Sequence, residues 1–201
     1  MPDVYAHCPT LTGPTLTLRP VAMEDAEALL LVYGDETRIP FFNSDNCHGD
    51  NFHYPTLARM QQAIRFWLDS YAHGYFVRWT VAAAGTPIGT VECFHRVAED
   101  AYGGCALLRI DLRGDMDTAA VNGECLDLLL PHLQALFHAD RAAIKAPPVA
   151  EGRIAALKAR GFTPGDAPLI GHDGTCYCDY WGRGYDEARA ICARRGTLHH
   201  G

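Results

Sequence analysis

The spacing of apolar and polar residues along the chain predicts a mixed α and β domain. Polar and apolar residues alternate from 15 to 19, which is the pattern of a half-buried strand. From 56 to 73 the large apolar residues recur every three or four positions, which predicts an amphipathic helix that ends at Gly74. Apolar runs at 75–83 and 87–95 flank a short turn, and this arrangement predicts a β-hairpin.

The remaining segments continue the alternation of strands and helices. We expect a helix at 24–33, a strand at 105–112, a helix at 119–137 that Pro131 kinks or breaks, a strand at 141–146, a helix at 150–160, and a late strand at 175–181. The segment 35–54 is irregular, and a loop of that length in a compact domain is often functional. We therefore expect one domain at 1–182, followed by a polar helix or tail at 183–201.

Composition and charge exclude several classes of protein. Of the 201 residues 48% are hydrophobic and 20% are charged, which suits a domain with a buried core. The net charge of -7 and the scattered basic residues argue against nucleic acid as a partner. No apolar stretch is long enough to span a bilayer, and the first ten residues lack the pattern of a signal peptide. We therefore expect a cytoplasmic protein with no membrane partner.

The eight cysteines are expected to be reduced, and most of them buried. Cys176 and Cys178 form a C-x-C pair near His172, which is a weak pattern for a metal site because no second close pair accompanies it. A strand that directs both cysteines to the same side explains the spacing as well. We expect no metal.

Three separated parts of the sequence together resemble a known family. The first is LTLRP at 16–20 followed by EDAEAL at 24–29, the second is 79–83 with PIGTV at 87–91, and the third is ALKARGF at 156–162. Their order and spacing resemble the RimJ/RimL-like branch of the GNAT superfamily of acyl-CoA N-acyltransferases.

This resemblance implies an α+β fold and a cofactor. The implied fold is a mostly antiparallel sheet of six or seven strands with helices on both faces, in which the strands at 105–112 and 141–146 are neighbours that diverge. Acetyl-CoA would lie in the gap as co-substrate, its pantetheine arm along the backbone of the first strand and its pyrophosphate at the N-terminus of the helix that begins near Ala119. The implied cofactor-binding residues are Ile110, Leu112, Arg113, Thr118, Ala119, Ala120 and Val121.

The predicted pyrophosphate loop departs from the family pattern Q/R-x-x-G-x-G/A. Asp115 stands at the basic or amide position and Thr118 at the first glycine, so that only Ala120 fits. The carboxylates of Asp115 and Asp117 would repel a pyrophosphate, and we expect weak binding of acetyl-CoA. Either aspartate could instead cap the helix.

The late helix departs from the family pattern as well. Ala150 and Arg153 stand where relatives carry Asn and Ser, and Leu157 stands where some relatives carry a tyrosine acid. The resemblance therefore supplies no general acid.

Acyl transfer to an amine requires a group that removes the proton from the amine. Glu92, on the strand after the hairpin turn, is the candidate base, although a solvent-facing strand residue explains it equally. His95 ends the same strand and reads as a surface residue. Tyr177 could donate a proton to the leaving thiolate or could simply pack.

Aromatic residues are the candidates for the acceptor site. Phe41, Phe42 and Trp79 are expected to line it, the first two because they lie in the loop at 35–54, where the family places acceptor specificity.

Two functions remain open at this point. The first is an N-acetyltransferase that acts on a primary amine of a protein N-terminus or of a small molecule. The second is a GNAT-fold binding or scaffold protein that has lost acetyl-CoA. The oligomeric state is open, and a homodimer is compatible with the sequence.

Overall fold

The computed structural model describes residues 3–184. Within them eight strands form one sheet, namely β1 (Leu11–Thr12), β2 (Leu16–Pro20), β3 (Val77–Ala83), β4 (Thr86–His95), β5 (Ala106–Leu112), β6 (Ala142–Lys145), β10 (Tyr180–Arg183) and β7 (Thr163–Pro164). Their order in space is β1-β2-β3-β4-β5-β6-β10-β7. In this part of the chain β5 and β6 are the parallel pair, and the other neighbours are antiparallel. The mixed, mostly antiparallel sheet is the predicted one.

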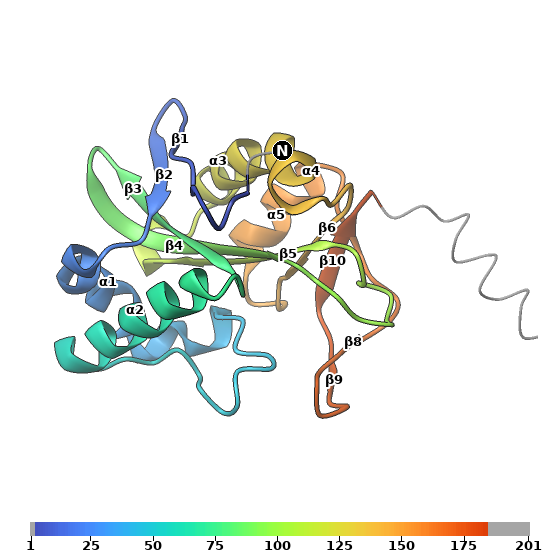
Figure 1. The fold of residues 1–201 in the computed structure, drawn as a ribbon, viewed down its shortest axis with the longest axis horizontal. Coiled ribbons are helices and arrows are strands. Elements are labelled where there is room, and N and C mark those ends of the chain that lie inside the picture. Colours follow the sequence, from blue (N-terminus) through green and yellow to red (C-terminus); the bar gives the residue numbers. More distant parts are fainter. Residues whose placement is uncertain (1–2, 185–201) are drawn as a thin grey trace, which may run out of the picture.

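Two elements extend the sheet beyond the six or seven predicted strands. β1 and β7 are two residues each, too short to leave a periodic pattern in the sequence. The expected strand at 175–181 is divided into β9 (Cys176–Tyr177) and β10, because Asp179 between them adopts a φ of 66° that a strand cannot contain. β9 pairs with β8 (Leu169–Ile170) in a separate ribbon at one end of the molecule (Figure 1).

The predicted hairpin is present, with Trp79 opposite Val91 in its register. Its turn residues Ala84 and Gly85 have φ of 46° and 81°, and a two-residue turn with both φ values positive matches the twist of the strands it joins. β4 continues the register into β5, so that β3, β4 and β5 form the centre of the sheet.

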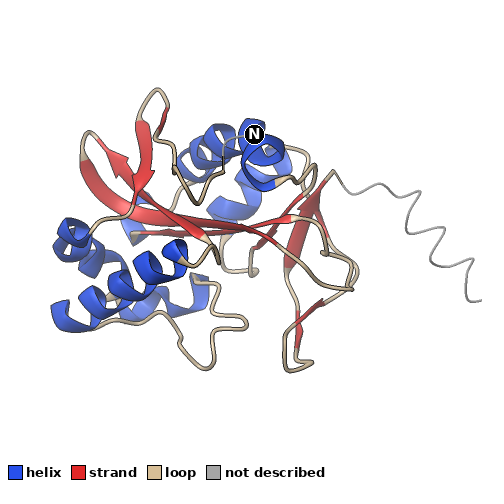
Figure 2. Ribbon diagram, in the orientation of Figure 1, coloured by secondary structure: helices blue, strands red, loops and turns tan. Residues whose placement is uncertain are grey.

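Helices cover both faces of the sheet (Figure 2). α1 (Ala26–Tyr33), preceded by the 3-10 turn η1 (Met23–Asp25), and α2 (Leu57–Ala72) lie on one face; α3 (Ala119–Leu129), α4 (Leu133–Phe137) and α5 (Glu151–Ala159) lie on the other (Figure 1). The helix predicted at 119–137 breaks at η4 (Leu130–His132), which contains Pro131, as expected of a residue without a backbone N–H. The irregular segment 35–54 includes the 3-10 helix η2 (Glu36–Phe41). All but the first two residues of the polar helix or tail predicted at 183–201 lie outside the described residues.

Alternation along the central strands gives the two faces different chemistry. Leu108 and Ile110 of β5 belong to the apolar core under α3 and α5. Arg109 and Asp111 take the alternate positions and face the side of α1, where Tyr33 donates to Asp111 across 3.0 Å. One face of the sheet is therefore apolar, and the other carries charges beneath its helices. Among residues 3–184 none of the helices combines the length and the apolar character that a membrane crossing requires.

Candidate functional site

The strands β5 and β6 diverge as predicted. Their pairing covers Ala106 with Ala142, Leu107 with Ala143 and Leu108 with Ile144. β5 nevertheless continues to Leu112 and stays paired with Gly89 of β4 on its other side. A gap therefore opens between residues 109–112 of β5 and the end of β6 at Lys145.

The side chain of Arg153 lies in this gap. Its Nη2 donates to the carbonyl oxygen of Ile110 at 2.5 Å, and its Nη1 donates to the carbonyl oxygen of Lys145 at 3.1 Å, so that the guanidinium bridges the two strands. The residue is 1% exposed. Burial lowers the pKa of Arg153, although Asp117 and Asp111 favour its charged form, and an arginine remains protonated after such a shift.

The loop that leads from β5 into α3 has its own cap. Thr118 is the N-cap of α3, and its hydroxyl accepts from the amide of Val121 at 3.3 Å. The alternative that Asp115 or Asp117 caps the helix does not hold, because Thr118, one residue nearer the helix than Asp117, has the β-region backbone of an N-cap. Thr118, Ala119 and Ala120 are exposed, so the first turn of α3 opens to solvent.

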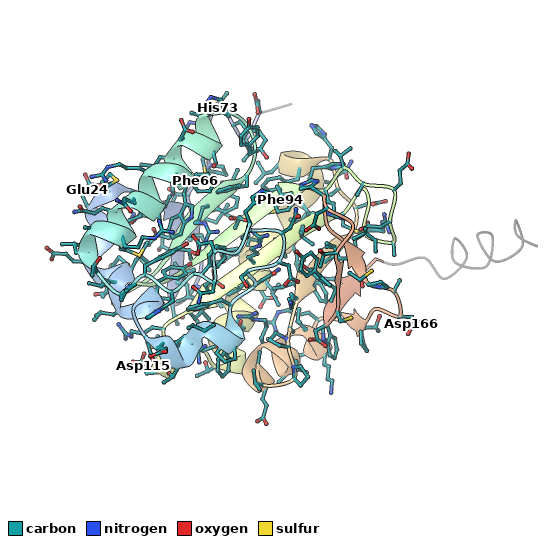
Figure 3. All side chains as sticks on the ribbon, turned by 90° about the horizontal axis from the view of Figure 1, so that it is seen from below. Glu24, Phe66, His73, Phe94, Asp115 and Asp166 are labelled. Atoms are coloured by element: carbon teal, nitrogen blue, oxygen red, sulfur yellow. The ribbon has the colours of Figure 1, made fainter. Side chains whose placement is uncertain are left out.

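The two aspartates of the loop point in different directions. Asp115 lies on the outside of the molecule (Figure 3), where Arg113 contacts both of its carboxylate oxygens at 2.6 and 3.0 Å. Asp117 turns inward, with its side chain 4% exposed, and forms an ion pair with Arg38. Asn122 donates to the same carboxylate at 2.7 Å. The charge of each aspartate is thus compensated by an arginine, and the partner of Asp117 lies far from it in the sequence.

Helix α5 packs closely against the start of α3. A Cβ on Gly152 would lie 2.8 Å from the carbonyl oxygen of Asp117 and 3.2 Å from the amide nitrogen of Ala119. Both contacts are with backbone, which cannot rotate away, so the approach of the two helices requires glycine here. This approach places Arg153, the next residue, at the mouth of the gap.

These observations decide how acetyl-CoA, the cofactor that the resemblance implies, fits the chain. The exposed first turn of α3 fits a pyrophosphate, because Thr118, Ala119 and Ala120 leave it accessible and a helix N-terminus attracts anions. Ile110 and Leu112 lie on the diverging strand where the pantetheine arm is expected, and both side chains are buried in the core. The gap beside them is occupied by the guanidinium of Arg153.

Glu92, the candidate base, lies in a buried charge network. It is 0% exposed, and its two carboxylate oxygens contact Arg78 and, at 2.7 Å, Arg109. Burial by itself would raise the pKa of Glu92, but Arg109 and Arg78 outweigh it and lower the pKa. A carboxylate that is held in its charged form by two cations is a weak base. Its catalytic role stays a prediction, and the contacts favour a structural role.

A second buried carboxylate in the same network has the opposite pKa shift. Asp111 accepts from Tyr33, and Arg78 lies 3.6 Å away, but within residues 3–184 its Oδ1 has no hydrogen-bond partner. Burial dominates and raises its pKa. No sequence pattern points to Arg78, Arg109 and Asp111, because charged residues at alternate strand positions look the same whether helices or solvent cover that face.

The other candidate catalytic residues lie apart from one another. His95 is exposed at the end of β4 that pairs with Ala106, so it lies ~20 Å along the strands from the gap at Leu112. One of its ring nitrogens contacts the carbonyl of Phe137 at 2.8 Å. Tyr177 is on the β8–β9 ribbon, with its ring centre 6.0 Å from the Nζ of Lys145. Of the two, Tyr177 is therefore the one near the gap.

The aromatic candidates for the acceptor site are mostly interior. Phe42 is buried and packs on Tyr33 with ring centres 5.2 Å apart. Trp79 is fully buried, and its Nε1 donates to the carbonyl of Pro9 at 2.9 Å. Phe41 is partly exposed and lies 3.8 Å below the guanidinium of Arg38. Phe41 is therefore the aromatic residue that lies beside the loop before α3.

The fold is shared with solved acetyltransferases. RimJ from Mycobacterium smegmatis, solved with a CoA disulfide, superposes with a TM-score of 0.64 at 17% identity, covering 93% of this chain and 94% of RimJ. An acetyl transferase of Salmonella typhimurium that modifies the N-terminal serine of the ribosomal protein L7/L12 gives 0.64 at 14% identity, covering 89% of this chain and 100% of the other. The chain has the GNAT fold. MccE, the microcin C7 self-immunity acetyltransferase in complex with acetyl-CoA and AMP, has the fold as well, with a TM-score of 0.63 at 14% identity over 85% of this chain and 93% of MccE.

The GNAT fold is recognised here through structure alone. No protein-family model matches the sequence, and no curated protein is similar to it. Sequence identities of 14–17% establish a shared arrangement of strands and helices only, and the chemistry depends on the residues of the gap.

Proposed function

We propose that this chain is an acyl-CoA-dependent N-acyltransferase that moves an acetyl group to a primary amine. The observation that carries the proposal is the divergence of β5 and β6. β5 stays paired with β4 as far as Leu112, while its pairing with β6 stops at Leu108, so its far edge lacks a strand partner in the described part of the chain. An extended arm with amide groups, such as pantetheine, can pair with such an edge.

The position of α3 supports the same proposal. Its exposed first turn follows directly on β5, so an anion held there lies in line with the gap. The amides of Val121 and Thr118 already donate to the Thr118 hydroxyl and to the carbonyl of Met116, so the amides of Ala119 and Ala120 would hold the pyrophosphate. Arg113 would add a cation if it left Asp115. CoA and acetyl-CoA in the RimJ and MccE structures support acetyl-CoA as the donor.

In the proposed reaction the amine nitrogen bonds to the acyl carbon and the carbon–sulfur bond breaks. The nitrogen gives up one proton and the sulfur gains one, so that CoA leaves as a thiol. Tyr177 is retained as the candidate acid because its ribbon lies beside Lys145, where the gap begins. The acceptor remains the primary amine of a protein N-terminus or of a small molecule.

A GNAT-fold binding protein without acyl transfer is the second candidate. The observation in its favour is the guanidinium of Arg153 in the gap, bonded to Ile110 and Lys145. The two candidates make opposite predictions for acetyl-CoA.

The test is acetyl transfer from acetyl-CoA to a panel of peptides with free N-termini and of small amines. Product is followed by mass, because Cys176 and Cys178 are exposed and would react with thiol reagents. Ala120→Asp should abolish transfer by placing a carboxylate at the exposed start of α3, where an acid is compatible with folding. Ala135→Asp, on the exposed side of α4, is the matched control and should be as active as the parent. Absence of both product and acetyl-CoA binding would favour the second candidate.

A further inference from the structure

The gap between β5 and β6 is bridged by a side chain that uses the strands' own carbonyl groups. Arg153 donates to Ile110 at 2.5 Å on one strand and to Lys145 at 3.1 Å on the other. Ile110 is one of the two residues along which the pantetheine arm is expected to run. The guanidinium and the arm therefore compete for the same space and for the same backbone.

The position of Arg153 is set by the packing of α5 rather than by chance rotation of an exposed side chain. The contact of Gly152 with the backbone of Asp117 and Ala119 fixes the start of the helix. Arg153 follows directly and is 1% exposed, so its side chain does not reach solvent in this conformation. Its side chain therefore fills the gap between the two strands.

The hydrogen bonding of Arg153 in this position is incomplete. Its Nε has no hydrogen-bond partner among residues 3–184, and the same is true of Oδ1 of the neighbouring Asp111. Burial and the nearby cation of Arg38 disfavour its charge, whereas Asp117 and Asp111 favour it, and the net effect is a lowered pKa of Arg153. A guanidinium with an unsatisfied donor loses fewer hydrogen bonds on leaving its position than one with all five donors engaged.

We propose that Arg153 controls entry to the gap: acyl-CoA binds only to the conformation in which this side chain has withdrawn. The inference rests on the proposed function, since it names the residue that limits cofactor binding at that site. If the open conformation is populated at ~1–10%, the apparent affinity for acyl-CoA falls ~10- to 100-fold below that of a permanently open gap. Arg153 is on this view a positioning residue, because it acts by leaving the site.

The experiment measures binding of acetyl-CoA by calorimetry to the parent and to Arg153→Ser. Removal of the side chain should tighten binding ~10- to 100-fold. Arg160→Ser is the matched control: this arginine follows the same helix and pairs with Asp127 at 2.6 Å outside the gap, so its removal should leave the affinity unchanged. Adenosine 3′,5′-bisphosphate, which has no pantetheine arm, should bind the parent and Arg153→Ser alike.

Arg153→Gln is measured beside the serine variant, because glutamine retains a donor for the Ile110 carbonyl and preserves more of the packing. It should tighten binding by an intermediate factor. Equal, measurable affinity of the parent, Arg153→Ser and Arg153→Gln for acetyl-CoA would overturn the inference and leave the proposed function standing. A gain for adenosine 3′,5′-bisphosphate as large as that for acetyl-CoA would also overturn it, since the arm would then be irrelevant. Absence of acetyl-CoA binding in every folded variant would overturn the proposed function itself.

Discussion

The substitution Glu92→Gln distinguishes a structural role of this carboxylate from a catalytic one. The substitution removes the charge that Arg78 and Arg109 share, and both arginines stay buried. Breaking a buried ion pair costs ~3–5 kcal/mol, because the remaining charge is left without compensation. Asp111, 3.6 Å from Arg78, compensates in part, and glutamine keeps one acceptor oxygen, so we expect the lower end of that range.

A loss of ~3 kcal/mol should lower the melting temperature of a domain of this size by ~6–12 °C. Thermal unfolding followed by circular dichroism at pH 7 measures this shift, and turnover is measured below the melting range. Glu99→Gln, on an exposed loop, is the control and should change stability by no more than ~0.5 kcal/mol. A structural role predicts nearly parental turnover per folded molecule, whereas the base hypothesis predicts a loss of ~100-fold or more with the fold intact. An unchanged melting temperature would refute the reasoning from the ion pairs.

The stability of the same variant relative to the parent should depend on pH. The pKa of Glu92 is lower in the folded state than in the unfolded chain, so its contribution to stability is present above the unfolded pKa of ~4.3 and is lost as the pH falls toward the folded pKa. The stability difference between the parent and Glu92→Gln should therefore be constant from pH 7 to 5 and should shrink below ~4. A difference that persists undiminished under acid conditions would show that packing, and not charge, is what the substitution removes.

Three further predictions concern neighbouring residues. The raised pKa of Asp111 means that its charge costs stability above the folded pKa, so Asp111→Asn should be neutral or stabilising at pH 7 in urea unfolding, and a loss of several kcal/mol would contradict this. Gly152→Ala should cost ~1–3 kcal/mol in the same assay through contact with Asp117, whereas Gly182→Ala, whose nearest contact is 3.9 Å away, should cost less. The double change Asp115→Arg with Thr118→Gly should strengthen the binding of acetyl-CoA. Added salt should lower the affinity of this double variant for acetyl-CoA more than that of the parent. Calorimetry that finds no gain in affinity would mean that the parental loop already binds the pyrophosphate as well as the altered one.

The order of elements could be predicted because it leaves periodic patterns in the sequence. The apolar face of α2 and the break at Pro131 follow from residues within one element. The adjacency of β5 and β6 follows from the resemblance to the GNAT superfamily. The charged interior could not be predicted in this way. Arg78 and Glu92 occupy alternate positions of a hairpin, and only the packing of α1 and α2 over that face determines that they are buried together.

The state of the gap depends on distances that no local pattern contains. The sequence shows that Arg153 stands where relatives carry Ser. The direction of its side chain, however, depends on how closely α5 approaches α3, and Gly152 sets that distance. The partners of Asp115 and Asp117 were missed for two different reasons. Arg113 is two residues from Asp115 and could have been paired with it, whereas Arg38 is far from Asp117 in sequence and comes beside it only in the fold.

The ion pair between Arg38 and Asp117 joins two loops that would serve different ligands. Arg38 belongs to η2, in the segment where acceptor choice is expected, and Asp117 belongs to the loop where the pyrophosphate is expected. A ligand that weakens this contact from one side changes the free energy of the other loop, and linkage makes the effect equal in both directions. On the proposed function, the affinities for donor and acceptor in this protein are therefore not independent. The free energy that couples them is given by the factor by which a saturating acceptor changes the affinity for acetyl-CoA, and it should fall when the ion pair is removed in Arg38→Gln.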